Sequence, residues 1–362
     1  MIIGLTHKDE APQERRLFSY QDNDATPDET LHKAISPYLF DASLLSDPHL
    51  VVERTRSVTA GMPAIRVGSK PVDGGYYVMD SAARSAFLQM EPNAESFIRP
   101  YVGSNEHING GERWILCLDS VAPQILKSMP KVLDTIEQVR LWRLGELPPR
   151  KLQDDTEAAD NKASPLSLTL AKTPAAFHVT VLPNQPFLAI PEVSSERRAY
   201  LPIAWLDPPT IPSNKLLIAL DVELYHFGLI TSRMHMVWVW HIGGRLKSDP
   251  QYSPGISYNP FPWPDLSDAV KARIGRLADS VLTARSAHPG SNLADLYDRR
   301  TMPKDLMRAH EKLDLAVDRL FRSAAFTSDR ERVEHLFGLY DKAVAPLAAA
   351  ARSTKPHRRR AS

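Results

Sequence analysis

Proline is the residue that most constrains the fold of this chain. Thirty prolines occur in 362 residues, and they are concentrated up to Pro264. Proline fixes its φ angle and lacks a backbone N–H, so frequent prolines break helices and favour short strands joined by turns. We therefore expect the first two-thirds of the chain to be rich in strands and loops. Residues 177–182 and 237–240 are predicted strands, because both are dense in β-branched and aromatic residues.

Other segments favour helices. Apolar residues recur at helical spacing over residues 121–144, which predicts a helix interrupted or begun at Pro130. After Pro264 prolines are few, and three further segments, starting near residues 265, 304 and 330, have the same spacing. The sequence thus predicts a helical C-terminal domain, whose three helices could form a small bundle. Residues 152–164 have almost nothing to bury and are predicted to be a solvated loop or helix end.

The charge balance excludes a global basic field. Lys and Arg total 44 against 43 Asp and Glu, but residues 265–362 alone hold 19 basic and 13 acidic residues. The basic end, residues 355–360, is predicted to be disordered, with a phosphate-neutralising role as the alternative. A single cysteine, Cys117, excludes an intramolecular disulfide and indicates a reducing cytoplasm. No apolar run is long enough to span a membrane, so we expect a soluble, cytoplasmic protein.

No complete catalytic motif is present. The sequence has no phosphate-binding P-loop, dinucleotide fingerprint, zinc-protease helix or nucleophile elbow. His226, His235 and His241 lie close in sequence, but spacings of nine and six residues match no metal site. Residues 207–210 and 259–262 imitate the Asn/Asp/Ser-Pro-Pro-aromatic motif of amino-methyltransferases, in which a ring stacks on a flipped base. The first lacks the aromatic residue and the second places it too early, so both are predicted turns.

Two polar segments could bind phosphates or bases. Residues 194–198, Ser-Ser-Glu-Arg-Arg, follow the apolar segment 187–191 and precede another at 200–205, and are predicted to be a loop between strands. Its hydroxyls and guanidinium groups suit a phosphate backbone, although ordinary loops carry such residues too. Residues 233–249 combine Arg, Lys and Ser with glycine turns. We expect their apolar members in the core, whereas Arg245 and Lys247 could be either DNA contacts or a solvated turn.

Several blocks, taken in order, resemble the MmeI-like restriction–modification enzymes. They are residues 97–104 (FIRPYVGS), 108–110, 113–114, 194–198, 232–236 (SRMHM), 244–249 (GRLKSD), 252–253 and 258–264 (YNPFPWP), with further blocks over 296–332. These enzymes join an endonuclease, an N6-adenine methyltransferase, a target-recognition domain and a helical tail. The resemblance implies a mixed α/β fold: a strand- and loop-rich DNA target-recognition domain followed by a small helical C-terminal domain.

The resemblance also implies a domain division. Residues 1–94 would be the end of a methyltransferase-like domain and a connector, 95–264 the target-recognition domain, 265–350 the helical domain and 351–362 a basic disordered tail. Residues 2–4 resemble one of the last strands of the catalytic domain. The family's methyl-donor loop and Asn-Pro-Pro-aromatic motif are expected upstream of this chain, so we expect no cofactor here and S-adenosylmethionine in that catalytic domain.

A DNA-binding role is carried over to the positions that match the family. They are Ser194, Ser195, Arg197, Arg233, His235, Arg245, Lys247 and Ser248. One departure is Pro250-Gln251, where the family usually has an Arg, so one expected cation is absent. The implied partners are double-stranded DNA and a separately encoded methyltransferase or endonuclease chain.

The sequence therefore favours the DNA-recognition portion of a type II restriction–modification N6-adenine methyltransferase that is not active alone. Two alternatives stay open. One is a complete adenine methyltransferase that uses Asp207-Pro208-Pro209 in an atypical active site, and the other is a protein-interaction scaffold. Binding of S-adenosylmethionine would favour the first, and a salt-dependent affinity for duplex DNA would argue against the second.

Overall fold

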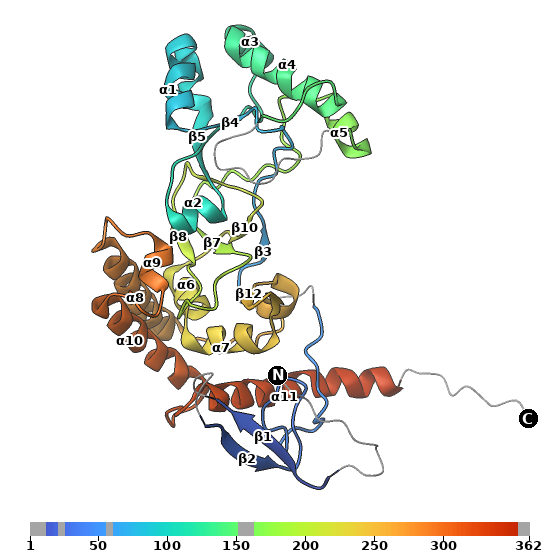
Figure 1. Cartoon of the computed structure of the whole chain (residues 1–362), viewed down its shortest axis with the longest axis vertical. Coiled ribbons are helices and arrows are strands. Elements are labelled where there is room, and N and C mark those ends of the chain that lie inside the picture. The colour runs from blue at the N-terminus through green and yellow to red at the C-terminus, as the bar shows by residue number, and fades with distance from the viewer. Residues whose placement is uncertain (1–11, 21–25, 56–60, 151–162, 354–362) are drawn as a thin grey trace, which may run out of the picture.

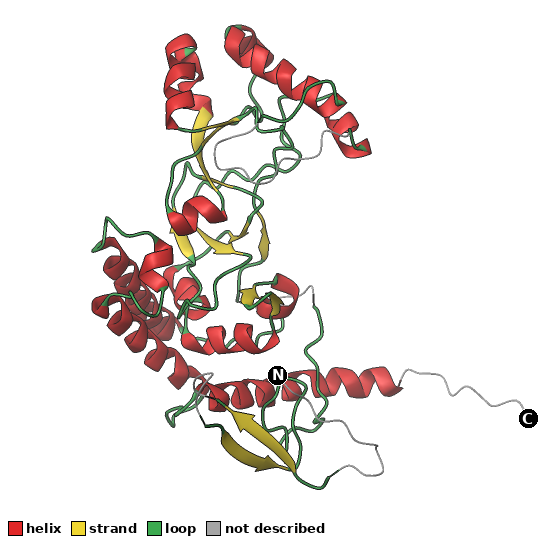
Figure 2. Cartoon of the chain, in the orientation of Figure 1, coloured by secondary structure: helices red, strands yellow, loops and turns green. Residues whose placement is uncertain are grey.

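The computed structural model is elongated, with lobes stacked along its longest axis (Figure 1). It describes residues 12–20, 26–55, 61–150 and 163–353, with side chains through residue 345. Strands and helices alternate through most of the chain, and from residue 268 on the described elements are helices (Figure 2). The mixed α/β fold with a helical C-terminal region is thus confirmed. The predicted strand at residues 2–4 and the polar segment 153–162 lie outside the described residues.

The N-terminal segment packs against the last helix. Strands β1 (Arg15–Ser19) and β2 (Asp28–His32) form an antiparallel hairpin next to α11 (Asp329–Ser353) (Figure 1). In the following loop, the backbone N–H and the hydroxyl of Ser46 both donate to the Asp341 carboxylate, at 2.8 and 2.6 Å. Phe40 packs on Phe337 with ring centroids 4.6 Å apart. These contacts join the two ends of the described chain into one body.

The distal lobe is built on a four-stranded sheet. Its strand order is β4 (Val78–Met79), β6 (Trp114–Leu116), β5 (Ile98–Val102) and β9 (Ile211–Pro212). The helices of this lobe are α1 (Ser81–Met90), η2 (Pro92–Phe97), α2 (Ser104–Asn109), α3 (Pro123–Lys127), α4 (Pro130–Leu144) and α5 (Pro165–Leu170). The helix predicted at 121–144 is confirmed, with α4 beginning at Pro130.

A buried arginine holds the distal lobe together. The side chain of Arg143, which is fully buried, donates five hydrogen bonds to the backbone carbonyls of Pro71, Val72, Leu170, Thr173 and Ala176. The guanidinium therefore satisfies loop carbonyls that would otherwise be buried without donors.

The central lobe contains the second four-stranded sheet. Its order is β3 (Ile65–Val67), β10 (Leu216–Ala219), β7 (Phe187–Pro191) and β8 (Ala204–Leu206). Residues 177–182, predicted as a strand, are not one. Only Val179 forms a bridge, to Lys70, and the N–H of Val181 donates to the Ser69 hydroxyl rather than to a neighbouring strand. Because the Ser69 hydroxyl takes the place of a backbone acceptor, the pairing with residues 69–70 does not continue past Val179, and the segment is irregular.

The strand predicted at residues 237–240 is also wrong. These residues lie in α7 (Arg233–Ile242), which follows α6 (Leu224–Ile230) and begins at Ser232, whose side chain accepts from the N–H of His235. Val237, Trp238 and Val239 are all buried, so consecutive positions of α7 are covered. A helix buried on nearly all sides lacks a polar face, and its apolar run has the composition of a strand.

The C-terminal helices are confirmed, although they do not form a simple three-helix bundle. Helix α8 (Asp268–Ser286) packs on α6 and on α10 (Lys304–Phe321). The short α9 (Leu293–Tyr297), which lies between α8 and α10 in the chain, packs on α2, and α11 packs on α7. The close contact of α6 with α8 requires Gly228, because a Cβ there would lie 2.8 Å from Ile274. None of the described helices is long and apolar enough to cross a membrane.

Candidate nucleic-acid interface

Two of the predicted polar segments lie side by side. Strands β11 (Gly244–Leu246) and β12 (Asp249–Gln251) form a hairpin after α7. Val193 bridges to Gln251, and the N–H of Glu196 donates to the Asp249 carboxylate at 3.0 Å, although these last two residues are 53 positions apart. The 194–198 loop and the hairpin therefore form one continuous surface.

The hairpin presents its polar side chains to solvent. Arg245, Lys247 and Ser248 are exposed. The Arg245 guanidinium donates to the carbonyls of Trp240 and Ser248, at 2.9 and 3.1 Å, and lies 5.0 Å from the centre of the Trp240 ring. These contacts fix the orientation of the guanidinium while leaving it accessible.

The turn of the hairpin is held in an uncommon conformation. Lys247 has a φ of +58°, in the left-handed region that favours glycine. A lysine at this position costs stability relative to glycine, and the ammonium group is carried to the tip of the hairpin. Such backbone strain is concentrated at functional sites, which makes the tip a candidate contact.

The 194–198 loop contributes one exposed cation. Arg197 has a side chain that is 74% exposed, and its Nε lies 4.0 Å from the Asp298 carboxylate. Ser195 is half-buried, and its hydroxyl accepts from the N–H of Arg197 at 3.4 Å. Ser194 is buried and receives a hydrogen bond from Arg198 at 3.4 Å. Of this loop, Arg197 is thus the predicted residue best placed to meet a ligand.

The C-terminal domain adds two arginines to the same surface. The N–H of Arg299 donates to the carbonyl of Arg197 at 3.1 Å, and Arg198 bridges to Asp298. Arg299 and Arg300 are both exposed. We name the exposed side chains gathered here the loop–hairpin surface: Arg197, Arg245, Lys247, Ser248, Arg299 and Arg300. The two added arginines were missed in the sequence, where the basic excess of residues 265–362 was the only signal.

Arg233 does not belong to the loop–hairpin surface. Its guanidinium makes a two-pronged ion pair with Asp329 of α11, and its backbone N–H donates to Asp314 of α10 at 2.6 Å. Asp314 also accepts from the Tyr200 hydroxyl at 2.6 Å. Burial raises the pKa of Asp314 to about 7. In this structure Arg233 therefore ties α7 to the C-terminal helices.

His235 is fully buried in an aromatic core. Its ring stacks on Trp263 at 4.9 Å, meets the edge of Phe261 at 4.8 Å, and Nε2 lies 2.9 Å from the Tyr252 hydroxyl. Burial lowers the pKa of His235 to about 3, so the ring is neutral at physiological pH. A direct DNA contact by this imidazole would require the core to open. The DNA role carried over from the family therefore does not fit the place of His235 in this fold.

The two methyltransferase-like segments are turns, as predicted. Residues 207–210 form an exposed turn between β8 and β9, with the N–H of Thr210 donating to the Asp207 carbonyl at 3.2 Å. In the second segment, Asn259 donates to the Thr55 carbonyl at 2.9 Å and Phe261 is buried. The three histidines weighed as metal ligands do not converge, and the described residues hold no group of three His, Cys, Asp or Glu suited to a metal.

Comparison with known proteins matches most of the chain to two family models. Residues 46–265 match the family model described as MmeI, target recognition domain, and residues 266–348 match MmeI, C-terminal domain. The chain belongs to the MmeI family. The loop–hairpin surface draws on both matched regions, because Arg299 and Arg300 lie beyond residue 265.

Two relatives of the MmeI family illustrate the relationship. The chain is 36% identical over 308 residues to DNA methyltransferase A of Bacillus subtilis (strain 168), covering 85% of this chain and 32% of that protein. A solved structure of the type IIL restriction-modification enzyme MmeI in complex with DNA matches with a TM-score of 0.77 and 32% identity, over 93% of this chain and 42% of that one. The chain thus spans less than half the length of either protein.

Proposed function

We propose that this chain is the DNA sequence-recognition portion of a type II restriction–modification N6-adenine methyltransferase. The observation that carries the proposal is the loop–hairpin surface, where five cations and one hydroxyl from three separate segments meet in an exposed patch. Guanidinium and ammonium groups bind phosphates, and Arg, Lys and Ser also bind base edges in the major groove. The similarity to an MmeI structure solved with DNA supports the same partner here.

In this proposal the chemistry is performed elsewhere. S-adenosylmethionine carries a sulfonium cation and an adenine ring, and its methyl group is what the reaction transfers. A pocket between α8 and α10 is lined by the cations Arg273, Arg276, Lys312 and Arg319 and by neither a carboxylate nor an aromatic ring, so it does not fit the donor. We propose that the donor and the flipped adenine bind a methyltransferase domain that this chain accompanies, in the same polypeptide or as a separate one.

The test is binding of the chain to fluorescent 30-base-pair duplexes of random sequence at several salt concentrations. Arg245→Gln/Lys247→Gln should weaken binding and make the dependence of log K on log salt shallower by about 1 per cation removed. Lys33→Gln/Lys342→Gln is the matched control, since it removes the same charge from exposed positions just after β2 and in α11, outside the loop–hairpin surface. No salt-dependent affinity for DNA in the parent chain would overturn the proposal.

Two further measurements address the alternatives. Sequencing the duplexes selected from a random pool should yield one enriched site, which a protein-interaction scaffold would not select. Titration with S-adenosylmethionine should give no binding by this chain. Methylation of adenine by the isolated chain would instead establish the complete-enzyme alternative.

A further inference from the structure

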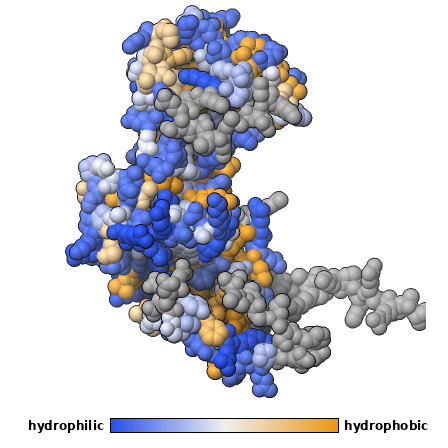
Figure 3. Space-filling model, in the orientation of Figure 1, coloured by the Kyte–Doolittle hydropathy of each residue, from blue (hydrophilic) through white to orange (hydrophobic). Residues whose placement is uncertain are grey.

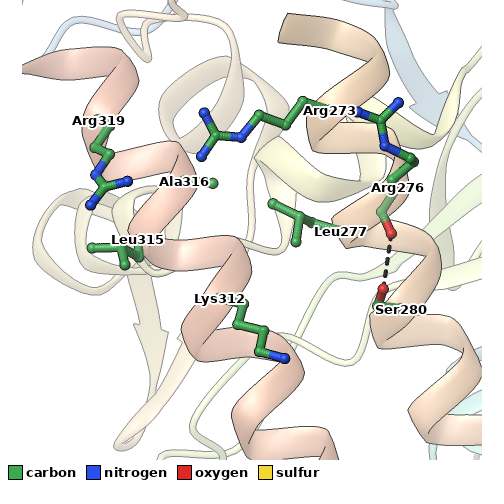
Figure 4. Close-up of a pocket in the computed structure, with 8 residues that line it drawn as sticks. All are labelled: Arg273, Arg276, Leu277, Ser280, Lys312, Leu315, Ala316 and Arg319. Atoms are coloured by element: carbon green, nitrogen blue, oxygen red, sulfur yellow. Dashed lines mark hydrogen bonds between the residues drawn. The ribbon is translucent and has the colours of Figure 1, made fainter.

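A hollow of about 290 Å³ lies between α8 and α10, and none of its lining residues belongs to the loop–hairpin surface. It is lined by Arg273 and Arg276 from α8, by Lys312 and Arg319 from α10, and by the small or apolar residues Leu277, Ser280, Leu315 and Ala316 (Figure 4). Arg273 extends from α8 toward Arg319 (Figure 4). The lining thus combines four cations with no acidic residue.

These cations have no partners in the part of the chain that is described. No ion pair joins any of the four to a carboxylate, and all four are exposed. Arginines three positions apart on one helix, such as Arg273 and Arg276, repel each other and do not stabilise it. The visible surface over α8 and α10 is mostly hydrophilic (Figure 3). The cluster therefore suits an anion from outside the chain.

Helix α10 buries two of its four carboxylates and exposes more basic than acidic side chains. Asp314 and Asp318 are buried, and they bind Tyr200 and Arg332 respectively. Lys312 and Arg319 lie on the outer face and border the hollow. The exposed charged side chains of α10 are therefore four basic ones, Lys304, Arg308, Lys312 and Arg319, against two acidic ones, Asp305 and Glu311.

The spread of the cations indicates a polyanion rather than a single phosphate. Lys312 and Arg319 are seven residues apart, which is about 10 Å along a helix axis. One DNA strand carries a phosphate about every 3.4 Å along the duplex axis, so this length corresponds to roughly three phosphates. The cations therefore match a run of backbone phosphates better than one phosphate group.

We propose that the α8–α10 hollow is a second DNA-backbone site, which binds phosphates outside the sequence read by the loop–hairpin surface. This inference rests on the proposed function, because it assumes that duplex DNA is the partner. The site contacts phosphates through cations alone, so it contributes affinity that is independent of sequence. It enlarges the footprint of the protein on DNA beyond the recognised bases.

The experiment compares three double variants of the full chain on the same 30-base-pair random duplex. Arg273→Gln/Arg319→Gln should make the salt dependence shallower by about 2, which is on the order of a 60-fold loss of affinity at 0.1 M salt if each cation neutralises one phosphate. Arg273→Lys/Arg319→Lys should restore most of the affinity, since the charges are kept. Lys33→Gln/Lys342→Gln should bind like the parent. Thermal melting should be unchanged for all three, because the substituted side chains are exposed.

The outcomes separate this inference from the proposed function. If Arg273→Gln/Arg319→Gln binds like the parent while Arg245→Gln/Lys247→Gln is weakened, the α8–α10 inference is wrong and the recognition function stands. If the parent does not bind duplex DNA, both are wrong. If Arg273→Gln/Arg319→Gln and Lys33→Gln/Lys342→Gln lose the same amount of DNA affinity, the loss reflects only the net charge of the protein, and the proposal of a second site is wrong.

Discussion

The assignment of Arg233 to the fold rather than to DNA predicts the effect of Arg233→Met. The substitution keeps an apolar stem and removes a guanidinium that binds both carboxylate oxygens of Asp329. The two side chains are 28% and 38% exposed, between the surface pairs that contribute about 0–1 kcal/mol and the buried pairs whose disruption costs about 3–5 kcal/mol. Arg332 keeps a contact with Asp329 at 3.3 Å, so we expect a loss of about 1–2 kcal/mol.

The assay is urea and thermal unfolding beside DNA binding. A loss of about 1–2 kcal/mol should lower the melting temperature by roughly 1–3 °C for a chain of 362 residues. Arg245→Met is the matched control. It removes the same charge from an exposed hairpin, so it should change stability by less than about 0.5 kcal/mol while weakening DNA binding.

A double-mutant cycle isolates the ion pair. Arg233→Met should cost less stability when Asp329→Asn is already present, because the pair is then already weakened. If Arg233→Met instead unfolded like the parent and lost DNA affinity as Arg245→Met does, the guanidinium would face DNA. The reasoning from this structure would then be refuted.

Three further predictions concern the turn, the distal lobe and pH. Lys247→Gly should raise stability by about 0.5–1 kcal/mol, because it relieves a positive φ, yet weaken DNA binding; a loss in both would show that the turn is not strained. Arg143→Met should destabilise the distal lobe by about 3–5 kcal/mol, since it leaves five carbonyls without donors, and faster hydrogen exchange confined to that lobe would report it. Burial lowers the pKa of His235 to about 3 and of His107 to about 4, so each histidine favours the unfolded chain as the pH falls below 6.5, whereas Asp314, with a pKa raised to about 7, opposes this by favouring the folded state on protonation. Burial lowers the pKa of His226, His241, His310 and His335 in the same direction, so the histidines outweigh Asp314 once the pH is below 6.5. The unfolding free energy should therefore be lower at pH 5 than at pH 6 by about 1 kcal/mol or more, with a smaller change between pH 7 and 6, and constant or rising stability would contradict this.

The helices and turns with local signals could be predicted from the sequence. Pro130 begins α4 because its missing N–H is not needed in the first turn of a helix. The long C-terminal helices have one apolar face each, and that periodicity is readable without the fold. The turn at Asp207 followed from two successive prolines. In each case the information lies within a few residues of the element itself.

The rest depended on contacts between distant residues. Residues 237–240 of α7 have the composition of a strand because their surroundings, including Phe337 of α11, leave this helix without the polar face that would identify it in the sequence. The pairing of Glu196 with Asp249 could not be predicted either, because no local pattern specifies which loop a hairpin meets. For the same reason Arg299 became a candidate only once its N–H was found bonded to Arg197.

Helix α7 connects the C-terminal helices to the β11–β12 hairpin. In its first turn Arg233 is bound to α11 and His235 contacts Tyr252 just after β12, and near its C-terminus the Trp240 ring and carbonyl contact Arg245 of the hairpin. An isolated two-stranded hairpin is marginally stable in water. Its orientation here is set by α7, and fixing a binding element before it meets its ligand lowers the entropy cost of binding. If the hairpin binds DNA as proposed, Arg233 and His235 would contribute by holding α7, and with it the hairpin, in position.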